Sequence, residues 1–231
     1  MQPGNSGTLE LHRVIISNNA GVGVSVGDGT LSISQSTIDG NMSGGVAVSN
    51  GIVSISQSTI SSNRGGGISV MAATMFDIEN NFIIGNGQAT DPGSSAIGGI
   101  VIVPNIGGAK LTFNTIAFNN NNISLYQSGV TCAGADVVAQ GNIVYGNTRG
   151  TATTTAVQLG GACLFGNSLA LGSVSGDLGF KSPTPPLDLH LTAMSPATIV
   201  NAGGACTGVD FDGDSRPVGS ACDLGADEYR P

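Results

Sequence analysis

Charged and aromatic residues are scarce in this chain of 231 residues. Only 10% of the residues are charged, 4% are aromatic, and tryptophan is absent. The 7 lysines and arginines are scattered and are outnumbered by 15 acidic residues, which gives a net charge of −8. Nucleic acids and anionic membranes are bound through clustered basic side chains, so this composition disfavours both as partners.

Long hydrophobic runs are also missing. The longest, residues 96–103, is too short to span a bilayer and is followed by Pro104. The chain opens with Met-Gln-Pro-Gly, without the basic region and apolar run of a signal peptide. Because the composition is typical of exported proteins, we expect a secreted or cell-surface protein whose signal, with further N-terminal sequence, lies upstream of residue 1.

The cysteines do not form a metal-binding motif. None of the 4 cysteines has a CxxC neighbour or a histidine at zinc-finger spacing. An even number in a Ser/Thr/Asn-rich chain predicts two disulfides made in an oxidising compartment, with buried free thiols as the alternative.

Glycine and regularly spaced apolar residues dominate what is present. The chain has 37 glycines and 40% hydrophobic residues, a composition typical of β-structure with many tight turns. A motif, Ser/Asn-x-Ile/Val-x-x-Asn, recurs along the chain and predicts a repeat architecture. Its central apolar residues are 16, 38, 60, 83, 116, 144 and, more weakly, 164. The spacing of 22 between the first three of them is later lengthened by insertions.

Each repeat contains three short alternating segments. The second segment is centred on the motif. The first is found at 9–11, 31–33, 53–55, 76–78 and 109–111, and the third at 24–26, 46–48, 68–70, 100–102, 123–125 and 157–159. Alternation with period 2 turns the outer residues of each triplet inward, where they can stack on their counterparts one repeat away. The pattern predicts an all-β fold, a right-handed parallel β-helix of about seven coils of three strands.

The last residue of the motif is an asparagine in every clear copy. A stacked side-chain amide can donate to one neighbour and accept from the other, so we expect a structural ladder along the helix. Its members are Asn19, Asn41, Asn63, Asn86, Asn119 and Asn147.

Residues 8–167 resemble the parallel β-helix repeat shared by many secreted bacterial proteins and polysaccharide-cleaving enzymes. We therefore assign residues 1–167 to the coils. The remainder, 168–231, contains Gly-Asp-Leu-Gly-Phe at 176–180, Leu-Thr-Ala-Met-Ser-Pro-Ala at 191–197 and Asp-Leu-Gly-Ala-Asp-Glu at 223–228. These motifs are similar to the ending of bacterial surface β-helix proteins of the choice-of-anchor kind. The sequence departs from that pattern at Leu178, where proline is usual, and at 198–201.

The C-terminal segment is expected to be an irregular cap packed on the last coils as one structural unit. A Cys206–Cys222 bridge would hold it, which leaves Cys132 and Cys163, in adjacent late coils, as the second pair. Arg216 is expected to form a buried ion pair with a cap carboxylate. The first coil has no such cover, so end-to-end self-association through it is a hypothesis.

Three carboxylates in the cap, Asp210, Asp212 and Asp214, have the spacing of the first ligands of an EF-hand loop. Ser215 and Ala221 stand where that loop needs glycine and glutamate, so the EF-hand interpretation fails. A looser Ca²⁺ site is left open, and no cofactor is required.

Insertions beside the third segment suggest the walls of a groove. The outward residues of its floor are expected at 25, 47, 69, 101, 124 and 158, and none of these is ionisable. The binding candidates are therefore Gln158 on the floor and four loop residues: Asp91, Tyr126, Asp136 and Arg149.

The sheet of first segments offers the catalytic candidates. Asp77 and Lys110 are expected side by side one coil apart, with Glu79 farther along the strand. Such a cluster could supply acid and base, although a surface salt bridge is the simpler interpretation. His12 and His190 have no triad-like neighbourhood in the sequence.

These observations favour a non-catalytic secreted or cell-surface module, a stalk, adhesin or glycan-contact scaffold, as the C-terminal part of a longer protein. The alternative is a polysaccharide lyase or glycoside hydrolase, which rests on fold analogy. Extracellular polysaccharide is the partner class considered in both cases. Ice binding is disfavoured, because Thr37, Thr59 and Thr115 form one interrupted column rather than paired ranks.

Overall fold

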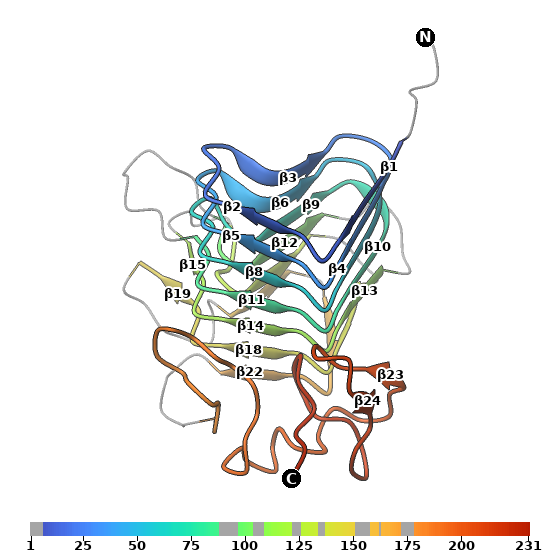
Figure 1. The fold of residues 1–231 in the computed structure, drawn as a ribbon, viewed down its shortest axis with the longest axis vertical. Coiled ribbons are helices and arrows are strands. Elements are labelled where there is room, and N and C mark those ends of the chain that lie inside the picture. The colour runs from blue at the N-terminus through green and yellow to red at the C-terminus, as the bar shows by residue number, and fades with distance from the viewer. Residues whose placement is uncertain are drawn as a thin grey trace.

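The computed structural model describes residues 7–87, 97–103, 109–121, 126–133, 137–150, 158–161, 163–171 and 178–231. Its regular elements are all strands, and they stack into a right-handed coil whose three faces are parallel sheets (Figure 1). No helix in the described part of the chain is long and apolar enough to cross a membrane. The predicted parallel β-helix is confirmed.

Each turn of the coil contributes one strand to each sheet. The first sheet contains β1 (Thr8–His12), β4 (Thr30–Ser34), β7 (Gly51–Ser56), β10 (Ala73–Glu79), β13 (Ala109–Thr112), β17 (Val137–Gln140) and β21 (Leu164–Gly166). The second contains β2 (Ile15–Ser17), β5 (Thr37–Asp39), β8 (Thr59–Ser61), β11 (Phe82–Ile84), β14 (Thr115–Ala117), β18 (Ile143–Tyr145) and β22 (Leu169–Leu171). The third contains β3 (Val22–Val26), β6 (Gly44–Val48), β9 (Ile68–Met71), β12 (Ile100–Val103), β16 (Val130–Cys132) and β20 (Leu159–Gly161).

Two short pairs complete the strands. One consists of β15 (Asn120–Asn121) and β19 (Thr148–Arg149), which pair in parallel between the second and third sheets. The other consists of β23 (Gly208–Val209) and β24 (Ser215–Arg216), an antiparallel pair in the C-terminal segment.

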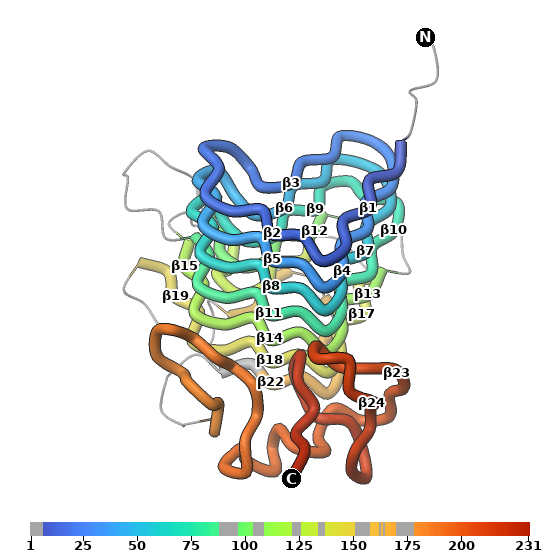
Figure 2. Tube along the Cα trace, viewed as in Figure 1, coloured from blue at the N-terminus to red at the C-terminus, as the bar shows by residue number. Residues whose placement is uncertain are grey.

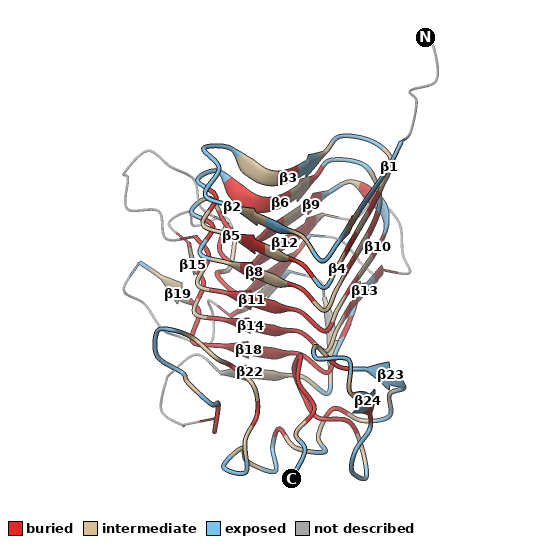
Figure 3. Ribbon diagram, viewed as in Figure 1, coloured by how far each residue is buried: buried red, intermediate tan, exposed pale blue. Residues whose placement is uncertain are grey.

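Apolar side chains stack in register inside the coil. In the second sheet, Ile38 is paired with Ile60 and Ile60 with Ile83, and all three are fully buried. Equivalent columns from the first and third sheets complete one continuous core, which follows the coil axis (Figure 3). Because a single coil exposes its apolar face, burial comes from stacking, as the repeat predicts.

The predicted amide ladder is present and is a chain of paired hydrogen bonds. The Oδ1 of Asn63 accepts from both the backbone N–H and the Nδ2 of Asn41, at 3.0 and 2.9 Å. The same pair of bonds recurs through all six predicted asparagines. The ladder satisfies the polar groups that a sharp corner would otherwise bury unpaired.

A second ladder occupies the corner between the first and second sheets. It uses the first residue of the same motif, so that the backbone N–H of Ser58 donates to Asn81 Oδ1 at 2.9 Å. Asn81 in turn donates to Asn114, and Asn114 to Asn142. Sequence reasoning recognised this position in the motif but did not assign it a role.

The third strand of the fifth coil differs from its predicted position. The strand is β16, at 130–132, whereas the predicted segment 123–125 lies outside the described residues. A column of glycines explains the register. Each of these glycines comes directly before the first inward residue of a third strand, and an added Cβ there would meet the ladder amide at 2.8 to 3.1 Å; they are Gly23, Gly45, Gly67, Gly99 and Gly129. Because only glycine lets the backbone approach the ladder this closely, Gly129 sets the position of β16.

The end of the coil is also placed differently. Leu164 was expected at the centre of a second strand, but it begins β21, which pairs with β17 in the first sheet. The seventh strand of the second sheet is β22, so the coils continue to residue 171 rather than 167.

The C-terminal segment packs beside the coils as well as near their end (Figure 2). Its apolar side chains, including Leu189, Leu191 and Ile199, form a second core with the outer faces of β11, β14 and β18. Those three strands are consequently buried on both faces, while β5 and β8 keep half-exposed outward side chains. The cap is thus a layer on the lower half of the second sheet.

Two disulfides and one buried ion pair stabilise this arrangement. The bridges join Cys206 to Cys222 and Cys132 to Cys163, as predicted. Arg216 Nη1 lies 3.6 Å from Glu228 Oε2, with both side chains 1% exposed, and its guanidinium also donates to the backbone oxygens of Asp223 and Gly225. The predicted buried ion pair of Arg216 is confirmed.

Candidate functional site

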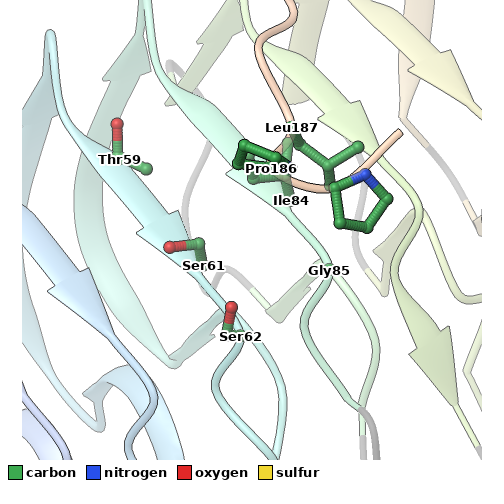
Figure 4. Close-up of a pocket in the computed structure, with 8 residues that line it drawn as sticks. Thr59, Ser61, Ser62, Ile84, Gly85, Pro186 and Leu187 are labelled. Carbon is green, nitrogen blue, oxygen red and sulfur yellow. The ribbon is translucent and has the colours of Figure 1, made fainter. Parts of the chain in front are cut away.

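A groove runs where the edge of the cap meets the outer face of the second sheet. Its first part has a volume of about 450 Å³ and lies between strand β8 and a proline-rich cap loop. Figure 4 shows Thr59, Ser61 and Ser62 along one wall, and Pro186 and Leu187 above Ile84 on the other. Hydroxyl groups thus face an apolar wall across the groove.

A second compartment of about 330 Å³ adjoins the first, and the two share Thr59, Ile84, Pro186 and Leu187. It brings in the ionisable side chains Asp188 and His190, together with Phe82 and Phe211. The groove therefore passes from a neutral part to a charged part.

His190 is the centre of the charged part. Its Nδ1 is hydrogen-bonded to Asp188 Oδ1, and its Nε2 lies 3.2 Å from Asp212 Oδ2. Asp227 lies beside it, 7% exposed, and accepts a hydrogen bond of 2.6 Å from the backbone N–H of Leu191. Lys181 completes the cluster by pairing with Asp188 at 2.9 Å.

Aromatic edges hold the imidazole in place. The ring centroid of His190 is 5.0 Å from that of Phe82, on β11, and 5.8 Å from that of Phe211, on the cap. Phe82 and Phe211 also meet each other at 4.5 Å. The histidine therefore has its orientation set on two sides by rings and on a third by Asp188.

Burial and neighbouring charge shift the acidities of this cluster. Burial raises the pKa of Asp227 to about 6, despite its hydrogen bond from Leu191. For Asp188, burial is outweighed by hydrogen bonds from His190 and Lys181, which lower its pKa to about 2. Burial opposes protonation of His190, but the Asp188 bond and the charges of Asp227 and Asp212 raise the pKa of the ring.

The candidates of the first sheet lie together as expected from the sequence. Asp77 pairs in register with Lys110, and Glu79 with Thr112. No described ion pair within 4.0 Å joins Asp77 to Lys110, and Asp77 Oδ1 is buried without a hydrogen bond in the described structure. Burial, and then the charge of Asp77, raise the pKa of Glu79. The expected salt bridge is therefore not formed.

Of the binding candidates predicted near the groove, those that the structure describes do not form one site. Asp91 and Asp136 lie outside the described residues. Arg149 donates to the backbone oxygen of Tyr126 at 2.7 Å and to Gln127 Oε1 at 3.0 Å, so its guanidinium holds these two residues in place. Gln158 is fully buried and bonds Asn147, so it is not on the groove floor. The outward residues of the last two described strands of the third sheet are instead Thr131 and Gly160.

The three cap carboxylates do not converge on one point. Asp210 is fully buried and accepts the backbone N–H groups of Asp212, Asp214 and Glu228, at 3.0, 2.8 and 3.0 Å. Asp214 pairs with Arg230 at 3.1 Å, while Asp212 faces His190. Asp210 shapes the turn and is unavailable to a calcium ion shared by all three.

Sequence reasoning missed the His190 cluster because its members are far apart along the chain. A local signal existed for one contact, since Asp188 and His190 are two positions apart in a proline-preceded, extended segment. A second signal was the outward residues of the second strands, which change from Thr and Ser on β8 to Phe and Ile on β11. That change marks where another layer must cover the sheet.

The comparisons with known proteins agree with this architecture. A family model described as right-handed beta helix region matches residues 3–168. A search of curated proteins found no match. Among solved structures, the crystal structure of pectate lyase Pel9A is similar, with a TM-score of 0.56 and 16% identity over 96% of this chain. The match covers 65% of the pectate lyase, so this chain spans under two thirds of its length, and the likeness concerns the fold. The chain belongs to the right-handed β-helix family.

Proposed function

We propose that this chain is a non-catalytic extracellular module that contacts a glycan chain in the groove between strand β8 and the cap. The observation that carries the proposal is the lining of the first compartment. Hydroxyls of Thr59, Ser61 and Ser62 can bond sugar hydroxyls, while Pro186 and Leu187 offer an apolar surface to the C–H faces of a sugar ring. None of its described lining residues is ionisable, so this compartment favours binding over bond cleavage.

Two further features support an extracellular place of action. The two disulfides are typical of an oxidising compartment. The C-terminal motifs resemble those of choice-of-anchor surface proteins, which fits a module displayed on the cell surface. A coil whose sheets stack in register, with each turn contacting its neighbours, suits an elongated stalk or scaffold.

The test is binding to a panel of uronate and neutral polysaccharides, measured by affinity electrophoresis and calorimetry, while reducing ends and unsaturated products are followed. Ser61→Trp fills the groove and is expected to weaken binding about tenfold or more, the loss of about 1.4 kcal/mol. Ser17→Trp is the matched control, because Ser17 lies two coils away in the same outward column. Binding that is absent, or unaffected by Ser61→Trp, would overturn the proposal.

A second candidate is a polysaccharide lyase or glycoside hydrolase. The observation that favours it is the gathering of Asp77, Glu79 and Lys110 on adjacent strands of one sheet, with the pKa of Glu79 raised. The solved pectate lyase has a similar fold, which supports this candidate by analogy alone. Turnover of any polysaccharide that is lost in Asp77→Ala and Lys110→Ala would establish it and displace the non-catalytic proposal.

A further inference from the structure

The charged end of the groove holds more negative charge than the described cations balance. Lys181 pairs with Asp188, which leaves Asp212 and Asp227 facing a single imidazole. Asp227 is 7% exposed, and no described cation forms an ion pair with it within 4.0 Å. A carboxylate buried in this way is costly unless a positive charge reaches it.

The ligating atoms of three side chains converge here. One nitrogen of His190 and one oxygen each of Asp212 and Asp227 all lie within 4.8 Å of one another. In the described part of the chain, this is the one group of three such residues that meets that distance. They come from three segments of the cap, so the convergence is a property of the fold and not of a local motif.

We propose that His190, Asp212 and Asp227 bind one divalent transition-metal ion, for which Zn²⁺ is the best match. One imidazole nitrogen and two carboxylate oxygens are ligands that Zn²⁺ accepts at about 2.0–2.2 Å. Calcium prefers six to eight oxygens, so the same set is a poor calcium site. A tetrahedral ion held by three side chains keeps one position for water.

The second layer of contacts orients the ligands as a metal site requires. Asp188 accepts the Nδ1 proton of His190, which leaves Nε2 free to coordinate, the arrangement in which a carboxylate supports a metal-bound histidine. Asp210 accepts the N–H of Asp212 and so fixes the turn that presents it. Asp227 is bracketed by two backbone bonds, from Ala226 to Thr115 Oγ1 and from Glu228 to Asp210, each 3.0 Å long.

Metal binding requires the three ligand atoms, which lie within 4.8 Å of one another, to move closer together. Ligands of a tetrahedral zinc ion lie about 3.3 Å apart, a value that follows from the bond lengths. The Asp212 side chain is 49% exposed and can move, whereas Asp227 and His190 are held. The ion would therefore join the turn that bears Asp212 to the buried part of the cap.

The test is calorimetric titration of the EDTA-treated full chain with Zn²⁺, and with Ca²⁺ and Mg²⁺ for comparison. We expect one Zn²⁺ per chain, with affinity at least about 100-fold above that for Ca²⁺, and a higher Tm when Zn²⁺ is bound. Co²⁺ should give the visible absorption of a tetrahedral site. Asp212→Asn, at an exposed position, should abolish tight binding, and Asp188→Asn should weaken it about 10- to 100-fold.

Two control variants distinguish this site from adventitious binding. Asp214→Asn alters the same acidic turn but removes a carboxylate that pairs with Arg230. His12→Gln removes the other of the 2 histidines of the chain. Both should bind Zn²⁺ as the unaltered protein does. Absence of Zn²⁺ binding, or binding that survives Asp212→Asn and His190→Gln in folded variants, would overturn the proposal.

Discussion

Gln158 completes the ladder that Asn147 would otherwise leave open. Its Oε1 accepts from the backbone N–H and the Nδ2 of Asn147, at 3.1 and 2.7 Å, and its Nε2 folds back to the backbone oxygen of Asn147 at 2.6 Å. Gln158 also stands at the position that glycine occupies in the earlier coils. Because Leu159 pairs in register with Val130, Gln158 is the counterpart of Gly129 one coil later. Gln158 thus replaces the glycine of the sixth coil and also ends the asparagine ladder.

We expect Gln158→Ala to destabilise the protein by about 1–3 kcal/mol, because two buried donors of Asn147 would lose their acceptor. Chemical unfolding measures this difference. Gln140→Ala, at an exposed position on β17, is the matched control and should change stability by less than about 0.5 kcal/mol. Equal effects of the two substitutions would show that the ladder terminus has no energetic role.

The buried pair of Arg216 and Glu228 predicts a large effect for the loss of one partner. Arg216→Met leaves Glu228 buried without its cation, which should cost about 3–5 kcal/mol in the free energy of unfolding. Arg230→Met removes the exposed pair with Asp214 and should cost less than about 1 kcal/mol. Similar losses in the two variants would contradict the assignment of Arg216 to the cap interior.

The Cys206–Cys222 bridge closes a short loop in the cap, with a sequence separation of 16. Replacing both cysteines by serine should lower the unfolding free energy by about 3 kcal/mol, through the greater freedom of the unfolded chain. Thermal unfolding with and without reductant checks this, because the double variant should lose part of the sensitivity to reductant. An unchanged midpoint would mean that cap packing alone holds these segments.

The raised pKa of Glu79 predicts that the stability of the protein depends on pH. Since burial raises its pKa above the ordinary value of 4.5, the folded protein holds this proton more tightly than the unfolded chain does. The stability that this tightly held proton contributes is fully present below pH 4.5, and it is lost as the pH rises through the raised pKa of Glu79. Glu79→Gln should therefore gain in Tm relative to the unaltered protein as pH increases to neutral. Glu10→Gln, exposed on β1, should show no such trend.

Much of the coil was predictable from the sequence because its rules are local and repeated. The spacing of Ile38 and Ile60 sets their stacking, and the same spacing brings Asn41 and Asn63 together in the amide ladder at the corner. The fifth coil was misplaced because residues 123–125 alternate as well as 130–132 do. The preceding Gly129 was the signal that distinguishes them, and its meaning depends on a contact with Asn147.

The charged cluster could not be predicted in the same way. His190 and Asp227 are brought together by the folding of the cap, in which the Leu191 N–H donates to Asp227. The rings of Phe82 and Phe211 meet where this part of the cap packs on β11. No periodic pattern links residues that occur once each. The outward phenylalanine and isoleucine of β11 could have revealed that the sheet is covered, but not which acidic groups the cover brings.

The cap also contacts a coil far from the C-terminal end of the helix, and this contact affects the order of folding. Neighbouring coils contact one another over about one repeat of sequence, whereas Gln57 Nε2 donates to the backbone oxygen of Asp210, 153 residues later. Coils can therefore assemble one after another as the chain is synthesised, while this long-range contact must wait for the C-terminus. We therefore expect the cap to dock last during folding. The rate at which the folded protein unfolds then depends on how often the cap detaches from the coils.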